Sequence, residues 1–427
     1  MRRSVGFSMF LAASLMGGTA MAADLILPPI LQPAAMAWTG FHIGVQAGVG
    51  MGNLGYTTGS SPGTYSEFAT EFALGGVQFG YDHQFADRWV IGAEIEAGKL
   101  TAEYIVYEDF PPLFWADWQA SLTGRLGYLP TPDTMLYVRG GIAAIGVRSE
   151  EQFDGVPTGS VMAGRIGVGA ETFLTDSLSA RIEANYFMPT EAFLPSDGES
   201  FSPRMLTVTA GLNYNFGGET SSYPATTDAM IDWNGFYAGI SGGFNAGLLI
   251  RDTDEVGADV GPWGSDDFSF GGYVGYNVLL SPAFLAGIEL EGNWQSHEFH
   301  DPMGGGILVP PPTLFATIGE SAALSARLGF LTNPSTLVYG KLGAGLIRTT
   351  LNEDFYGVDD GSSFTELLPT VQIGAGIEAA IADNTTLRVE GVYTRALEGI
   401  TANNAQLNQI SHTPHMLTGR VGLAWHF

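Results

Sequence analysis

Charged side chains recur in this sequence two residues apart, with apolar residues between them. In Glu94-Ile95-Glu96 and Arg181-Ile182-Glu183 the charged residues occupy alternate positions. Alternate positions of an extended strand lie on one face, so both charges of each pair point to the same side. Carboxylates and guanidinium groups gathered on one face either form ion pairs in a buried space or line a water-filled channel.

Two pairs of histidines suggest a different chemistry. His297 and His300 precede Asp301, while His412 and His415 lie close to the C-terminus. A metal site needs three or four converging donors, which two loops can supply. Nothing in the spacing indicates that these donors converge, so we interpret them as ordinary loop histidines. We therefore predict no metal ion and no cofactor.

No pattern of residues predicts catalysis. Asp109, His42 and Ser149 are residue types that hydrolytic sites use, but no catalytic motif surrounds any of them. Gly44–Gly52 alternates as a strand and no helix is expected after it, which argues against a phosphate-binding loop. We predict that the protein is not an enzyme.

The composition limits the possible partners. The chain has 427 residues, no cysteine, 12% aromatic residues and a formal net charge of −27. Nucleic acid is therefore not expected as a partner. The aromatic content excludes an acidic disordered chain. Without disulfides, stability must come from burial or from insertion into a membrane.

The N-terminus has the features of a secretory signal peptide. Arg2 and Arg3 precede the apolar stretch Val5–Met16, and a small-residue cleavage motif ends at Ala22. We therefore predict that the rest of the chain is exported. The exported part has no apolar run of about 20 residues, so it must cross any membrane with strands.

Apolar residues alternate with polar residues or glycine along most of the chain, as in Ile91–Gly98, Leu122–Tyr128 and Ala180–Tyr186. These segments predict strands of about ten residues, the length of a tilted membrane-crossing strand. Short turns alternate with long polar loops, a pattern typical of outer-membrane barrels. We place the long loops near residues 52–70, 102–117, 149–159, 189–203, 251–267, 297–320, 352–366 and 398–413.

The sequence also repeats itself once. Trp38–Phe41 returns as Trp233–Phe236, an offset of 195 residues, while the later match of Arg181 with Arg388 has an offset of 207. The offset grows within the long loops, because loops tolerate insertions and strands do not. Each copy contains eight predicted strands.

Both copies end alike, with Gly211–Phe216 and Gly422–Phe427. A last strand of this kind resembles the signal read by the bacterial barrel-assembly machinery, carried here by Gly422, Trp425 and Phe427. With the Trp-x-Gly-Phe opening and the alternating strands, each copy resembles the small surface-exposed outer-membrane β-barrel (porin-family) proteins of alphaproteobacteria. The resemblance implies a bacterial outer-membrane protein that contributes to envelope integrity, without catalytic residues.

Two architectures remain open, two tandem eight-stranded barrels or one sixteen-stranded barrel. The inward positions of the first copy hold four acids and four bases. The second copy also balances, because Gln372 replaces one base and Arg420 supplies another. Buried charges must be paired, so separate neutrality favours two solid barrels. The predicted interior charge network comprises Glu94, Glu96, Arg125, Arg139, Arg165, Glu171, Arg181, Glu183, Glu289, Glu291, Arg327, Lys341, Glu378, Arg388, Glu390 and Arg420.

Domain limits follow from these patterns. We assign residues 1–22 to the signal peptide, 23–36 to a periplasmic segment, 37–216 to the first barrel, 217–232 to a periplasmic linker and 233–427 to the second barrel. The linker assignment rests on a composition rich in Gly, Ser, Thr and Pro, without alternation.

The remaining acids gather in the long loops, for example Asp254, Glu255 and Asp259. We interpret them as a solvated, repulsive surface, with weak binding of divalent cations as the functional alternative. The fold class is therefore an all-β transmembrane antiparallel barrel, and the expected function is that of a structural, surface-exposed protein of the bacterial outer membrane. Expected partners are outer-membrane lipid, lipopolysaccharide and, during insertion, the barrel-assembly machinery. The alternative is a sixteen-stranded general-diffusion porin that prefers cations.

Overall fold

The computed structural model describes residues 38–57, 65–105, 112–149, 157–194, 200–216, 231–252, 262–301, 313–352, 363–401 and 411–427. Within these ranges, no helix has the length and apolar character needed to cross a membrane. The predicted signal peptide, the N-terminal segment 23–36 and residues 217–230 of the predicted linker lie outside them and remain predictions.

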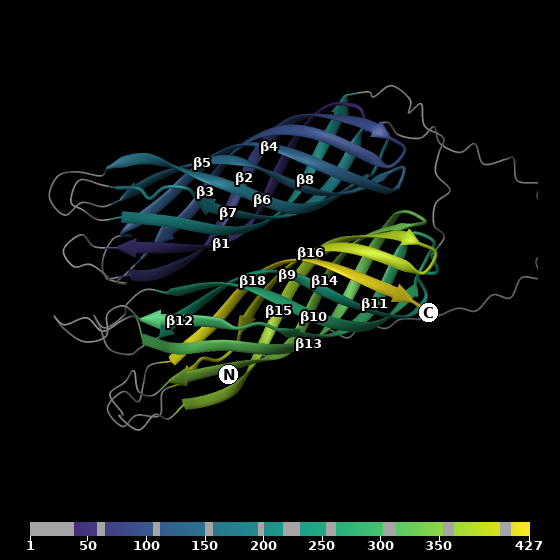
Figure 1. The fold of residues 1–427 in the computed structure, drawn as a ribbon. Helices are drawn as coiled ribbons and strands as arrows, with labels where there is room; N and C mark the ends of the chain where they lie inside the picture. Colours follow the sequence, from purple (N-terminus) through teal and green to yellow (C-terminus); the bar gives the residue numbers. More distant parts are fainter. Residues whose placement is uncertain are drawn as a thin grey trace, which may run out of the picture. The chain divides into compact units, whose positions relative to one another are not determined.

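The first copy closes into an antiparallel barrel of eight strands (Figure 1). Each strand pairs with the next in the chain, and β8 pairs with β1 from Phe216↔Phe41 to Ser200↔Thr57, which closes the ring. The strands are β1 (Gly40–Thr57), β2 (Tyr65–Ala86), β3 (Trp89–Tyr104), β4 (Phe114–Thr131), β5 (Thr134–Ser149), β6 (Thr158–Phe173), β7 (Leu178–Pro189) and β8 (Ser200–Phe216).

The second copy forms a ring of its own. β11 and β12 follow one another along β13, and β16 and β17 follow one another along β18. β18 pairs with β9, from His426↔Tyr237 to Ser411↔Asp252, and closes the ring. The single sixteen-stranded barrel is therefore not the fold of this chain. The strands are β9 (Gly235–Asp252), β10 (Trp263–Leu279), β11 (Phe284–Trp294), β12 (His297–Asp301), β13 (Thr313–Asn333), β14 (Thr336–Asn352), β15 (Ser363–Ala382), β16 (Thr385–Ala396), β17 (Ile400–Thr401) and β18 (Ser411–His426).

The strands extend further than the sequence pattern predicts. In the first barrel they run from 12 residues in β7 to 22 in β2, so the expected length of about ten was too short. The extensions enter the predicted loops, since β3 ends at Tyr104 and β4 begins at Phe114, inside the expected loop 102–117. Both aromatic side chains are buried. Because these inward residues are apolar, the contrast between a polar inner face and an apolar outer face is lost here. The sequence pattern therefore does not show where the strands end.

Outward-facing positions carry an apolar belt. In β1 and β2, the side chains of Ile43, Val45, Val77 and Phe79 are between 43% and 57% exposed. Their neighbours in sequence, such as Gln46 and Gln78, are buried inside the barrel. Exposed rows of aliphatic side chains are favourable in contact with lipid and unfavourable in contact with water.

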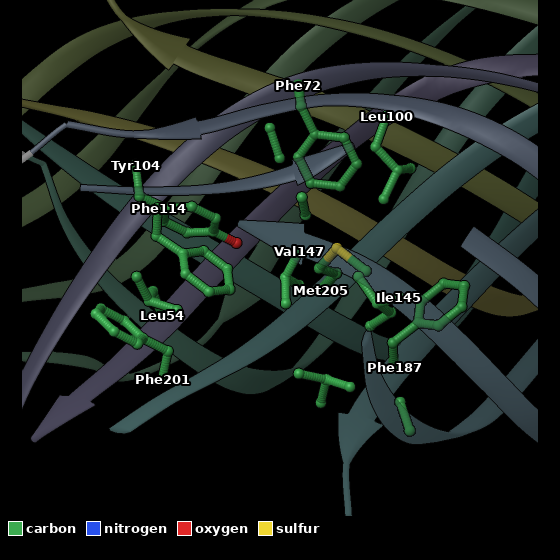
Figure 2. Close-up of a cluster of buried hydrophobic side chains, with 14 of the residues drawn as sticks. Leu54, Phe72, Leu100, Tyr104, Phe114, Ile145, Val147, Phe187, Phe201 and Met205 are labelled. Carbon is green, nitrogen blue, oxygen red and sulfur yellow. The ribbon is translucent and has the colours of Figure 1, made fainter. Parts of the chain in front are cut away.

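The interior of the first barrel has three layers. At the loop end lies an apolar cluster that includes Leu54, Leu100 and Phe114 (Figure 2). At the turn end lies a second apolar cluster, with Trp38 and Val90 among its members. The charged positions of β3 fall between Val90 and Leu100, so the charged layer lies between the two clusters.

The second barrel has the same layers. Its loop-end cluster contains Trp263, Phe299 and Phe315, and its turn-end cluster contains Trp233 and Leu337. These apolar side chains pack against one another because their contact with water is unfavourable.

The repeated Trp-x-Gly-Phe motif explains how the turn end is sealed. The Trp38 indole donates a hydrogen bond to the Pro132 carbonyl at 2.9 Å, and Trp233 donates to Pro334 at 2.8 Å. The motif glycine has a positive φ in both copies, 154° at Gly40 and 110° at Gly235, which a glycine adopts without strain. The tryptophan therefore turns into the barrel directly before the first strand begins.

Candidate functional site

The charged layer of the first barrel centres on Glu94, which β3 directs into the interior. The Arg139 Nη2 lies 3.0 Å from Glu94 Oε1, and the Arg181 Nη1 lies 2.8 Å from Glu94 Oε2. His42 Nε2 lies 3.0 Å from the same Oε2. All four side chains are buried. Since each cation shares a carboxylate with another group, no buried charge of this group stands alone.

A second group surrounds Glu96 and Glu183. Arg165 Nη1 is 2.9 Å from Glu96 Oε2, and one Arg165 nitrogen is 3.7 Å from Glu183 Oε2. Glu183 also pairs with Arg139 at 2.7 Å and accepts a hydrogen bond from the Tyr137 hydroxyl at 2.5 Å. Arg139 therefore links the two groups into one network.

The sequence reasoning missed one acid of this layer. Asp82 is buried and forms an ion pair with Arg125, whose other nitrogen lies 3.1 Å from Glu171 Oε2. The described interior of the first barrel thus holds five carboxylates and four arginines, and not four of each. His42 lies between Asp82 and Glu94, at 3.3 and 3.0 Å, and is the group that can carry the remaining positive charge.

The second barrel repeats the network with different side chains. Lys341 Nζ lies 2.7 Å from Glu291 and 3.0 Å from Glu390, and Arg388 lies 2.6 Å from Glu289. Arg327 pairs with Glu378, as Arg125 pairs with Glu171 in the first barrel. All sixteen residues of the predicted network are buried inside their barrels.

One cation has moved between strands. Arg165 of β6 in the first barrel corresponds to Gln372 of β15, and Thr209 of β8 corresponds to Arg420 of β18. Arg420 lies 2.5 Å from both Glu291 and Glu390. These carboxylates correspond to Glu96 and Glu183, the partners of Arg165, so the same two positions are neutralised from a different strand.

His42 and Asp82 are also replaced as a pair. At an offset of 195 residues stand Tyr237 and Asn277, both buried. The Tyr237 hydroxyl donates to Glu289 Oε2 at 2.9 Å, as His42 contacts Glu94. Histidine aside, the described residues of the second barrel therefore include four buried carboxylates and four buried cations.

The last strand contributes a glycine to this layer. A Cβ on Gly422 would lie 2.9 Å from Arg388 Nε, so the missing side chain makes room for the guanidinium group. Trp425 and Phe427 are 53% and 75% exposed. The three residues of the predicted assembly signal thus divide between an inward glycine and two outward aromatic residues.

Comparisons with known proteins identify this architecture. A family model described as the outer membrane protein beta-barrel domain matches residues 10–216 and again 220–412. The chain belongs to this family. Its localisation is accordingly the bacterial outer membrane, and its two matches reflect tandem domains.

Two curated relatives of this outer-membrane barrel protein are the 31 kDa outer-membrane immunogenic proteins of Brucella melitensis and Brucella suis. Each is 29% identical over 233 residues, which cover 48% of this chain and 96% of the relative. The resemblance to alphaproteobacterial outer-membrane proteins is thereby confirmed.

Solved structures give a more distant likeness. Neisserial surface protein A is 14% identical with a TM-score of 0.27, covering 44% of this chain and 97% of its own. The attachment invasion locus protein Ail of Yersinia pestis is 14% identical with a TM-score of 0.24, covering 45% and 99%.

The histidines of this outer-membrane barrel do not assemble a metal site within the described residues. His297 is buried, and the centroid of its ring lies 6.4 Å from that of Phe299. His412 is also buried, with its ring 5.9 Å from that of Trp263. His415 lies 3.1 Å from the Tyr393 hydroxyl. All four histidines of the two pairs belong to strands, His297 and His300 to β12 and His412 and His415 to β18, so their interpretation as loop residues was wrong.

Proposed function

We propose that this chain is a structural, surface-exposed component of the outer membrane, made of two solid barrels that display their loops outside the cell. The layered interior supports this proposal most directly. In each barrel an apolar cluster at the loop end and another at the turn end enclose the charged layer.

A diffusion porin needs a continuous polar lumen. Here the inward aromatic and aliphatic side chains of the loop end, such as Phe68, Tyr104 and Phe201, have at most 2% exposure. The four arginines of the charged layer in the first barrel contact carboxylates of the same barrel and are at most 5% exposed, so they do not line open water. This arrangement favours a rigid anchor over the cation-selective porin.

The remaining elements of the proposal concern the surface and assembly. Of the acids predicted in the long loops, Asp254, Glu255 and Asp259 lie outside the described residues, whereas Glu103 and Asp266 belong to the strands β3 and β10. We assign them a repulsive surface with a weak capacity for divalent cations. Gly422, Trp425 and Phe427 are assigned to recognition by the assembly machinery, and no catalytic activity is expected.

Conductance tests the proposal. The mature full-length chain is refolded in detergent, checked for the heat-dependent gel shift of a closed barrel and added to planar lipid bilayers. We expect folded protein with no sustained channel activity. A general-diffusion porin added under the same conditions serves as the positive control for channel detection. Regular single-channel steps from the wild-type protein would overturn the proposal.

A further inference from the structure

The outer face of the first barrel carries an apolar hollow of about 500 Å³. Side chains that project outward line it, among them Val77, Ile95, Leu122 and Ile142, each more than half exposed. The volume falls in the range of protein ligand pockets, roughly 300–1,000 Å³. The hollow therefore lies in the lipid-facing belt and is larger than a gap between neighbouring side chains.

Register explains why the belt is hollow at this place. Ala97, Ala120 and Ala144 are cross-strand neighbours on β3, β4 and β5, and they form the floor. The adjacent row toward the turn end consists of larger residues, Ile95↔Leu122 and Leu122↔Ile142. A row of alanines beside a row of branched aliphatic residues leaves a depression along the sheet.

The next row toward the loop end, which we call the rim, holds a cation and an indole. Lys99 and Trp118 are cross-strand partners, and Trp118 pairs with Gly146. A Cβ on Gly146 would lie 1.9 Å from Trp118 Nε1, so the glycine allows the indole to lie against β5. Both Lys99 and Trp118 are exposed.

Lys99 is exceptional in this acidic chain. The sequence contains two lysines, and the other, Lys341, is buried in the second barrel. Arg148, on the same end of the first barrel, pairs with Asp117 at 2.9 Å. Within the described residues, no carboxylate lies at ion-pair distance from Lys99. Its ammonium group is thus available to an anionic partner at the rim of the apolar hollow.

From this placement we infer that the hollow binds lipopolysaccharide, with one acyl chain along Ala97, Ala120 and Ala144 and a phosphate at Lys99. The loop end of an outer-membrane barrel faces the outer leaflet, where a lipid with phosphates and acyl chains is the abundant anion. The inference rests on the proposed function, because it assumes a barrel whose outer wall is permanently in contact with lipid.

The second barrel provides a natural control. Its floor positions are Gly292, Ala322 and Leu346, so a leucine stands where the first barrel has Ala144. Trp294 occupies the position of Lys99 at the offset of 195. The second barrel therefore lacks the rim cation, and part of the floor is filled.

The test titrates purified lipopolysaccharide into the refolded full-length chain and counts bound molecules by native mass spectrometry. Lys99→Gln removes the rim cation, and Ala120→Leu fills the floor. We expect about fivefold weaker binding for the first and about tenfold for the second. The matched change Ala322→Leu in the second barrel leaves the affinity unchanged. The heat-dependent gel shift verifies that each variant has folded.

Three results would overturn the inference. The first is equal affinity of folded wild type, K99Q and A120L. The second is equally tight binding of phosphatidylglycerol, which identifies a nonspecific lipid shell. The third is loss of a dimer in A120L with unchanged lipid affinity, which identifies an interface between copies. None of these affects the bilayer conductance that tests the proposed function, so the two failures are distinguishable.

Discussion

The two barrels solve one electrostatic problem with different residues. The first neutralises Glu96 and Glu183 with Arg165 on β6, whereas the second neutralises Glu291 and Glu390 with Arg420 on β18. Both copies pair these two carboxylates with an arginine, but the arginine comes from different strands. Inside a closed barrel, a carboxylate thus needs a cation whose side chain is long enough to contact it, and which strand supplies that cation matters less.

Removal of a central arginine is expected to have the largest effect on stability. Arg181→Met leaves Glu94 with fewer cations, and Arg388→Met does the same to Glu289. We expect each change to destabilise its own barrel by about 3 kcal/mol, because a buried carboxylate loses one of its cationic partners. Urea unfolding followed by proteinase K digestion, with fragments assigned by mass, measures each barrel separately. Equal loss of both barrels would contradict independent interiors.

Moving the arginine from β6 to β8 tests whether the two positions are equivalent. Arg165→Gln alone is expected to destabilise the first barrel by about 3 kcal/mol. Adding Thr209→Arg recreates the arrangement of Gln372 and Arg420 and should restore most of that stability. The same urea and digestion assay reports the double-mutant cycle. If Thr209→Arg gives no rescue, the equivalence of the two positions is wrong.

The pair of His42 and Asp82 offers a smaller test. Asp82→Asn removes one partner of Arg125, which keeps Glu171, so a loss of about 2 kcal/mol is expected. Adding His42→Tyr installs the residues of the second barrel and should recover much of the loss. Gly80 faces His42 as Gly275 faces Tyr237, which leaves room for the larger ring. A double variant less stable than Asp82→Asn would contradict this prediction.

An exposed ion pair should matter least. Arg348 and Glu320 form a pair on the second barrel in which both side chains are about half exposed. Arg348→Gln is expected to leave the unfolding midpoint of that barrel unchanged, because exposed pairs are screened by water and salt. A clear shift of the midpoint would show that charges outside the interior also determine stability.

The strand periodicity carries much of the information about this fold. A two-residue period assigns side chains to faces, which is why the inward positions of Glu94, Arg139 and Glu183 follow from sequence. The alternation of Ile43 and Val45 also assigns His42 to the interior, yet the sequence reasoning overlooked it. Asp82 is harder to assign, because Asp82-His83-Gln84 is polar on both faces.

The partners within the charged layer could not be predicted in the same way. Arg181 contacts Glu94 across 87 residues of sequence. Such contacts depend on the tilt and stagger of the closed barrel, which the pattern of a single strand does not contain. The apolar clusters at the loop ends were missed for a related reason, since buried aromatic residues such as Phe114 resemble loop or girdle residues in the sequence.

The pairing of first and last strands has a consequence for the origin of the molecule. In each barrel the start of the first strand lies beside the end of the last, at Phe41↔Phe216 and Tyr237↔His426. Because the chain crosses the membrane an even number of times, it ends on the same side of the membrane on which the first strand began. A gene duplication can therefore append a whole barrel without threading any new segment through the bilayer. By the same parity, a third barrel is as compatible with this topology as the second.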